Sequence, residues 1–191
     1  MLLGTDSKDG LWWFQQVSMA DNEHIPHIVL IAENGDQTTG EAARAASSIA
    51  GDLIEAYLGT TYQLGMGQAG PSLRIGESVG SGPGTVGGLL ADAGATCAAF
   101  ITAWNPHSNQ MTSEAQNEAA HARLLNRLAG FPGVTVHEGQ GVGTDEAWVP
   151  ERSVFAVGLA SSDAISLGRE FRQNAIVWIG DAGIPELVLL G

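Results

Sequence analysis

The order of the strand-like segments constrains the fold of this chain more than any other feature. From residue 57 onward, short apolar segments follow one another with helix-like segments between only some of them. The predicted order is roughly β-β-α-β-α-β-β-α-β-β. Parallel neighbours need a long crossover, so adjacent strands without helices between them argue against a fully parallel, doubly wound sheet. The sequence predicts an α+β fold with a single mixed, mainly antiparallel sheet and helices packed on it.

The individual elements have recognisable boundaries. The clearest helix covers residues 113–130, where Ser113 and Gln116 have capping-box spacing and Gly130 ends the helix. Residues 96–104 ("TCAAFITAW") form the most apolar candidate strand, which we expect near the centre of the sheet. Residues 175–190 contain two apolar segments joined by "DAGIP", a pattern that predicts a terminal hairpin.

The first part of the chain is interpreted as an N-terminal extension of residues 1–48, ahead of a single α+β domain of residues 49–191. Two short strand-like segments cover residues 11–18 and 27–33, and an apolar stripe predicts one helix over residues 39–58. The adjacent Trp12 and Trp13 predict a packing patch, which would be a partner surface if it were exposed.

Composition excludes several classes of protein. Of 191 residues, 44% are hydrophobic and 15% are charged, which is typical of a globular chain. No apolar run reaches the roughly 18–20 residues needed to cross a bilayer, and the N-terminus becomes polar after Leu3. We therefore expect a cytoplasmic protein without a membrane segment or a signal peptide. The single cysteine, Cys97, cannot form an internal disulfide and is interpreted as a small core residue.

The chain is strongly acidic, with a formal net charge of −13, and Lys8 is its only lysine. The arginines are scattered and form no basic stripe, so nucleic acid and anionic membranes are not expected partners. The acidity serves solubility or attracts a cationic partner.

Glycine-rich and histidine motifs give no cofactor or metal site. Residues 65–70 ("GMGQAG") have the G-x-G-x-x-G spacing, but Pro71 and a strand follow where a dinucleotide site needs a helix. Residues 80–88 open a helix but lack the lysine of a P-loop. The histidines have no metal-ligand spacing. We expect neither a cofactor nor a metal.

Polar residues gather after the predicted central strand. Thr102, Trp104, Asn105 and Ser108 follow it, at the strand end where sheet proteins commonly place ligand groups. Pro106 is expected to hold Asn105 in an extended conformation, which would aim its carboxamide.

The next helix carries two polar residues on the side that is otherwise apolar. Asn117 and His121 are four residues apart and share a face with Leu124 and Leu128, so both should face the loop after the central strand. A ligand site and a network that only satisfies the loop backbone both fit this pattern.

Two later segments complete the candidate site. In "DEAWVPERS", Trp148 precedes a strand, Glu151 stands at its entrance and Ser153 lies on the same face. Glu151 is either a general acid or base or an ordinary turn carboxylate. In "FRQNA", Asn174 suits a left-handed helix cap, which leaves Gln173 for the site.

The segments "ITAWNPHS", "WVPERS" and "FRQNAIVW", with Asn117 between the first two, resemble the bacterial domain-of-unknown-function family 3293 over about residues 57–190. Residues 1–48 lie outside the resemblance. The resemblance implies no reaction. It implies that eight residues belong to one constellation: Thr102, Asn105, Ser108, Asn117, Trp148, Glu151, Ser153 and Gln173.

These neutral hydrogen-bonding groups, with one carboxylate and one indole, favour a nucleotide-, nucleoside- or sugar-like ligand on which Trp104 or Trp148 stacks. Whether Glu151 also makes the protein a hydrolase or transferase stays open. The alternative is a non-enzymatic, acidic protein–protein interaction module that uses its charge or the Trp12–Trp13 segment.

Overall fold

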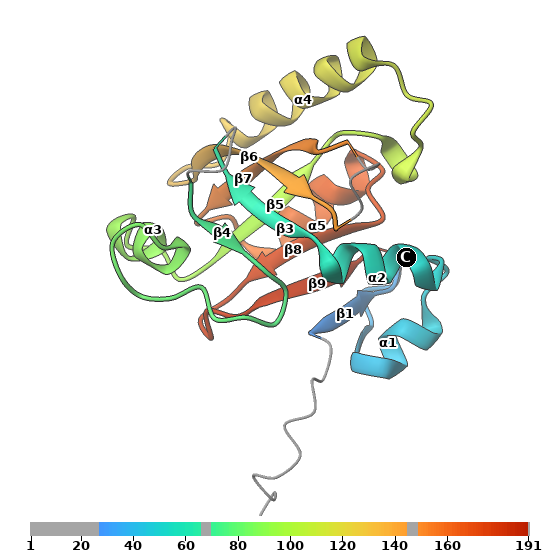
Figure 1. Ribbon diagram of the computed structural model, residues 1–191, viewed down its shortest axis with the longest axis horizontal. Helices are drawn as coiled ribbons and strands as arrows, with labels where there is room; N and C mark the ends of the chain where they lie inside the picture. Colours follow the sequence, from blue (N-terminus) through green and yellow to red (C-terminus); the bar gives the residue numbers. More distant parts are fainter. Residues whose placement is uncertain (1–26, 66–69, 145–148, 191) are drawn as a thin grey trace, which may run out of the picture.

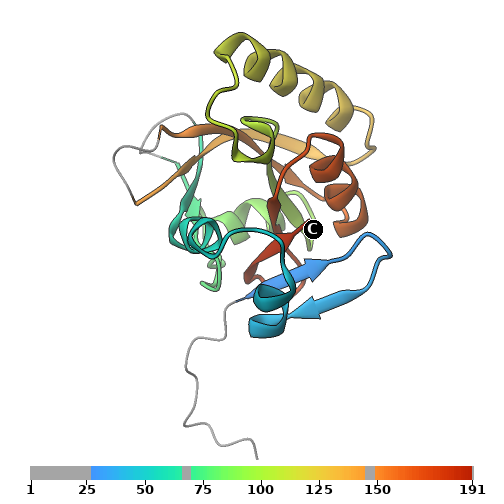
Figure 2. The ribbon, with the colours of Figure 1, turned by 90° about the vertical axis from the view of Figure 1, so that its right-hand side faces the viewer.

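The computed structural model describes residues 27–65, 70–144 and 149–190, which form one open sheet with helices around it (Figures 1 and 2). The strands are β1 (Ile28–Ile31), β2 (Gln37–Thr39), β3 (Thr61–Leu64), β4 (Ser72–Leu73), β5 (Ala98–Thr102), β6 (Thr135–Val142), β7 (Glu151–Val157), β8 (Ala175–Ile179) and β9 (Pro185–Leu189). The helices are α1 (Gly40–Ala46), α2 (Gly51–Gly59), α3 (Val86–Asp92), α4 (Glu114–Leu128) and α5 (Ser161–Glu170), with a 3-10 turn, η1 (Pro106–Ser108).

The strand order confirms the predicted fold class. The nine described strands are arranged β2-β1-β9-β8-β5-β7-β6-β3-β4. β1 and β9 are parallel, and the other described pairs are antiparallel. From β3 onward the element order is the predicted one, β5 lies at the middle of the sheet, and β8 and β9 form the predicted hairpin.

The two faces of β5 contact different parts of the core. Ala99 and Ile101 belong to the cluster that includes Leu124 of α4 and Leu167 of α5. Phe100 belongs to the opposite cluster. This alternation follows from the two-residue period of a strand, and it places α4 and α5 against the same face of the sheet.

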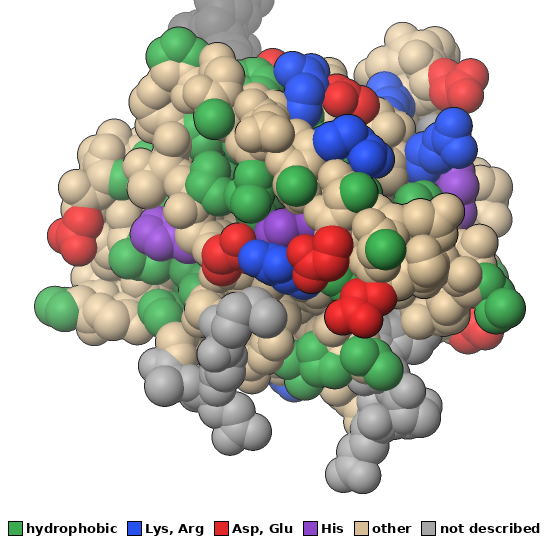
Figure 3. Space-filling view, turned by 90° about the horizontal axis from the view of Figure 1, so that it is seen from above, with side chains coloured by type: hydrophobic (Ala, Val, Ile, Leu, Met, Phe, Trp, Pro, Cys, Tyr) green, Lys and Arg blue, Asp and Glu red, His purple; other side chains and the backbone are tan. Residues whose placement is uncertain are grey.

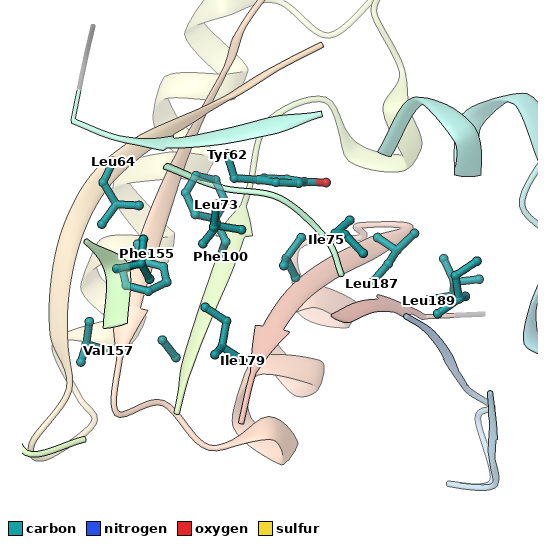
Figure 4. Packing of buried hydrophobic residues seen from close by; sticks show 14 of the residues in the cluster. Tyr62, Leu64, Leu73, Ile75, Phe100, Phe155, Val157, Ile179, Leu187 and Leu189 are labelled. Atoms are coloured by element: carbon teal, nitrogen blue, oxygen red, sulfur yellow. The ribbon is translucent and has the colours of Figure 1, made fainter. Parts of the chain in front are cut away.

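The sheet curls over the face that carries Phe100 (Figure 4). Tyr62 of β3 packs edge-on against Phe100, with ring centroids 5.2 Å apart. Beyond β4 the chain returns to the opposite side of the core, where the Gly76 N–H donates to the Pro185 carbonyl oxygen at 2.9 Å. The strands β3 and β4 therefore enclose one side of the core instead of extending a flat sheet.

The single helix predicted over residues 39–58 is wrong. The chain forms α1 and α2, separated by the non-helical Ser47 and Ala50, whose ψ angles are 141° and 138°. Ser47 Oγ accepts a hydrogen bond from the Ile49 N–H at 3.1 Å. Such a local bond competes with the helix ladder and explains the break.

The described part of the N-terminal extension contributes strands β1 and β2 to the sheet and contains helix α1. β1 corresponds to the strand predicted over residues 27–33, and Ile28 and Leu30 are buried in the core. The strand predicted over residues 11–18 lies outside the described residues. The domain boundary at residue 48 stays a prediction. None of the helices in the described ranges has the length and hydrophobicity needed to cross a membrane.

Candidate functional site

The chain leaves β5 through a strained loop. Asn105, His107 and Ser108 have φ angles of 45°, 54° and 56°. A left-handed conformation costs a non-glycine residue about 1–2 kcal/mol, so three of them within four positions require compensating contacts. The prediction that Pro106 holds Asn105 extended is wrong. Asparagine tolerates the left-handed region better than most residues, and its contacts hold it there.

Asn117 of α4 supplies those contacts. Its Oδ1 accepts a hydrogen bond from the Asn105 backbone N–H at 2.9 Å, and its Nδ2 donates to Asn105 Oδ1 at 2.8 Å. Both residues are buried, with 7% of Asn105 and 3% of Asn117 exposed. The predicted capping box between Ser113 and Gln116 is present and fixes the start of α4 just before Asn117. Asn117 therefore faces the loop, as predicted.

Asn105 in turn holds Glu151, the first residue of β7. Asn105 Nδ2 donates to Glu151 Oε1 at 2.8 Å, and Gln110 Nε2 lies 3.5 Å from the same oxygen. Burial raises the pKa of the Glu151 carboxyl, and the hydrogen bonds from Asn105 and Gln110 partly oppose that rise. An amide relay thus connects α4 to a partly buried carboxyl group.

Glu151 lines a cavity of about 120 Å³ inside the curled sheet. Its apolar lining includes Leu53, Phe100, Val177 and Leu187. Five of the predicted site residues line it: Thr102, Ser108, Glu151, Ser153 and Gln173. The cavity combines apolar walls with polar groups at the strand ends, which is the composition of small-molecule sites.

Two of these polar residues mainly support the backbone. Thr102 Oγ1 donates to the Arg152 carbonyl oxygen at 2.7 Å and accepts from the Trp104 N–H at 2.9 Å. Ser153 Oγ donates to the Glu151 carbonyl oxygen at 3.0 Å. Thr102 and Ser153 lie opposite each other in the β5–β7 register. Their hydrogen bonds therefore hold the strand ends beside the Glu151 carboxyl group.

Gln173 also fixes the loop. Its Nε2 donates to the carbonyl oxygens of Trp104 and Phe171, at 3.1 and 3.2 Å. The described residues form no hydrogen bond with its Oε1. Gln173 therefore has a structural role and also lines the cavity.

This geometry can be compared with known proteins. Residues 101–176 match the family described as "Protein of unknown function (DUF3293)". The predicted resemblance is confirmed over this DUF3293 segment, which spans the four parts of the candidate site. Neither the curated proteins nor the solved structures gave a match.

Two residues of the cavity region were not predicted. Tyr57 of α2, outside the DUF3293 segment, shares a hydrogen bond of 2.8 Å between its hydroxyl group and Ser108 Oγ. Asn174 Nδ2 donates to Ser108 Oγ at 3.1 Å and to the Tyr57 hydroxyl oxygen at 3.3 Å. The assignment of Asn174 to the left-handed cap is wrong, because Arg172 adopts that conformation with a φ of 55°.

Burial raises the pKa of Tyr57, and the nearby Glu151 adds to that rise. The sequence contained one signal for Tyr57. Its hydroxyl group stands on an otherwise apolar helix face, and a buried hydroxyl group needs a hydrogen-bond partner. The adjacent polar pair of Gln173 and Asn174 was a second signal.

Four predicted residues do not line this cavity: Trp104, Asn105, Asn117 and His121. Asn117 contacts Asn105, and Asn105 contacts the cavity residue Glu151. His121 is only 2% exposed, and its Nε2 lies 3.2 Å from Glu138 Oε2. Its ring meets Trp104 edge-on with centroids 6.5 Å apart. Trp148 lies outside the described residues.

Glu138 connects His121 to a surface network of charges. Arg152 forms ion pairs with Glu138 at 3.2 Å and with Glu118 of α4 at 3.0 Å. Figure 3 shows acidic and basic side chains side by side on the face seen from above. Within the described ranges, no group of His, Cys, Asp and Glu side chains could hold a metal ion.

Proposed function

We propose that the cavity binds a small nucleoside- or sugar-like molecule and that Glu151 exchanges a proton with it. The observation that carries this proposal is the relay from Asn117 through Asn105 to Glu151. It fixes a partly buried carboxyl group at an apolar cavity, although the loop that forms the relay is strained. Strain of this kind persists where the surrounding contacts enforce it, and it gathers at functional sites.

The chemistry of Glu151 fits an acid or base. Oε1 is occupied by Asn105, whereas the described residues donate no hydrogen bond to Oε2. A raised pKa brings a carboxyl group closer to neutral pH, where it can both donate and accept a proton. Tyr57 lines the same cavity, and its hydroxyl group is held by Ser108 and Asn174. It is a second polar contact for a ligand.

Size and charge narrow the ligand class. A volume of about 120 Å³ is below the roughly 300–1,000 Å³ of drug-sized pockets, so the cavity suits a compact ligand or a compact part of a larger one. No lysine or arginine occurs among the described residues that line it. Both properties favour an uncharged nucleoside or sugar over a nucleotide phosphate. Hydrolysis and group transfer are both compatible with one acid or base.

The test is thermal stabilisation by adenosine, uridine and D-ribose. We expect at least one of them to raise the Tm of the wild-type protein. Glu151→Gln should abolish that rise while the protein stays folded, because the amide cannot act as a carboxyl group. Tyr57→Phe should weaken it, because the phenyl ring keeps the shape and loses the hydroxyl group.

The matched control is Glu77→Gln, which makes the same change at an exposed position that does not line the cavity. It should respond like the wild type. An unchanged Tm with all three compounds, or an equal rise in Glu151→Gln, would show that the proposal is wrong. The alternative interaction module stays a prediction, because Trp12 and Trp13 lie outside the described residues.

A further inference from the structure

Two arginines of this acidic chain form neither an ion pair nor a side-chain hydrogen bond with any described residue. The chain has seven arginines and a net charge of −13, so acidic partners are abundant. Five arginines contact described groups: Arg44 with Glu55, Arg74 with Thr61, Arg127 with Glu170, Arg152 with Glu138 and Glu118, and Arg169 with the carbonyl oxygens of Ile31 and Ala32. Arg123 and Arg172 form no ion pair or side-chain hydrogen bond within the described ranges.

Both of these arginines line one groove. It lies between η1 and α4, has a volume of about 600 Å³, and is also lined by His107. No aspartate or glutamate occurs among its described lining residues. Figure 3 shows basic side chains beside a histidine at the right-hand end of the face seen from above. The groove is therefore a local concentration of positive charge on an acidic protein.

One acidic side chain beside the groove, Glu170, is already paired with another arginine. Glu170 lines an adjoining hollow together with Arg123 and Arg172. Its carboxylate, however, accepts three hydrogen bonds from Arg127, at 3.0, 3.1 and 3.0 Å. This bidentate pairing leaves Arg123 and Arg172 available for an external anion.

The backbone of Arg172 also favours a role for its side chain. Arg172 has a φ of 55°, a conformation in which glycine or asparagine is the usual residue. Its carbonyl oxygen accepts a hydrogen bond from the His107 N–H at 2.8 Å, which joins two left-handed residues on the same groove. An arginine at such a position lowers stability, so a contribution to binding would explain its presence.

We propose that this groove binds the phosphate group of a small molecule. Two guanidinium groups carry two positive charges and several N–H donors, and the His107 imidazole adds a further hydrogen-bonding group, which together suit a dianionic phosphate. Met111, which is 89% exposed, Pro106 and Ala120 add apolar contacts for the rest of the ligand. The proposal is independent of the cavity: Asn117 lines the groove, Glu151 lines the cavity, and Asn105 lies between them.

The experiment is isothermal titration calorimetry of the whole chain with inorganic phosphate and with phenyl phosphate, against sodium chloride at equal ionic strength. We expect both phosphates to bind, and phenyl phosphate to bind more tightly because its ring contacts the apolar wall. Arg123→Gln and Arg172→Gln should each weaken binding about tenfold or more, since each removes a charge-assisted contact.

Two further variants make the result decisive. Arg172→Gly removes the side chain at a backbone position that suits glycine, so it should lose phosphate binding while its Tm stays equal or rises. Arg74→Gln removes an exposed arginine elsewhere and should bind phosphate like the wild type. The absence of phosphate binding by the wild type, or equal losses in Arg74→Gln and the groove variants, would overturn the proposal.

Discussion

The carboxamide of Asn117 pairs with both the backbone and the side chain of Asn105, so a residue on α4 determines the conformation of the loop that follows β5. The Nδ2 group of Asn105 then donates to Glu151 Oε1 at 2.8 Å and lies 3.5 Å from Gln110 Oε1. The position of the carboxyl group therefore depends on a residue that does not line the cavity.

Asn117→Ala should destabilise the protein by about 1–3 kcal/mol, because it leaves buried polar groups of Asn105 without partners. The free energy of unfolding from urea titration measures this effect. Asn126→Ala, on an exposed part of the same helix, is the control and should change stability by less than about 0.5 kcal/mol. Equal effects of the two substitutions would contradict a special role for the asparagine pair.

The raised pKa of Glu151 predicts a specific dependence of stability on pH. The folded state binds this proton more tightly than the unfolded state, so the contribution of Glu151 is fully present below the unfolded pKa of roughly 4.3. It is lost as pH rises through the higher folded pKa.

Glu151→Gln removes this titration, so the stability of wild type relative to Glu151→Gln should decrease as pH rises above roughly 4.3. Urea unfolding of both proteins at several pH values measures the difference. The pKa of Glu138 is lowered in the fold and has the opposite effect, but it is present in both proteins. A difference that grows with pH in favour of the wild type would contradict the predicted sign.

Arg172→Gly should raise stability by about 0.5–1 kcal/mol. It removes left-handed strain of about 1–2 kcal/mol, and the greater freedom of glycine in the unfolded chain offsets part of the gain. Arg74→Gly is the control, because Arg74 has no positive φ. It should lower stability. The two midpoints of urea unfolding should therefore move in opposite directions.

Gly139 and Gly141 of β6 should differ sharply in their tolerance of alanine. A Cβ on Gly139 would lie 2.6 Å from the Gln63 carbonyl oxygen and 2.9 Å from Phe100 Cζ, so we expect Gly139→Ala to cost about 1–3 kcal/mol. A Cβ on Gly141 would meet only Thr60 Cγ2, at 3.5 Å. Thermal unfolding should show a lower Tm for Gly139→Ala and nearly the wild-type value for Gly141→Ala.

The sequence predicted most of the fold because its signals are local. The Ser113–Gln116 capping box and the apolar strand at residues 96–104 depend on residues close together in the chain, and both are confirmed. The curl of the sheet was not predicted, since it depends on contacts such as that between Tyr62 and Phe100. The break between α1 and α2 was missed because a serine side chain outweighed the helix propensity of its neighbours.

The candidate site was also predicted only where its signals are local in the sequence. Glu151, Ser153 and Gln173 were selected at element boundaries and do line one cavity. Tyr57 and Asn174 were missed as partners of Ser108, because they come from elements that meet only in the folded sheet. The conformation of Asn105 was predicted wrongly because the local effect of Pro106 is weaker than the hydrogen bonds from α4 and to β7.

The parallel pairing of β1 with β9 sets an order on folding. Val29 lies opposite Val188, so an early segment of the chain completes its hydrogen bonds only after a very late one has been synthesised. The hairpin β6–β7 joins strands that are close in sequence and precede β9, so it can form earlier. During synthesis, the apolar side chains of β1 therefore lack their β9 neighbours until late, and exposed apolar strands of this kind favour misassembly.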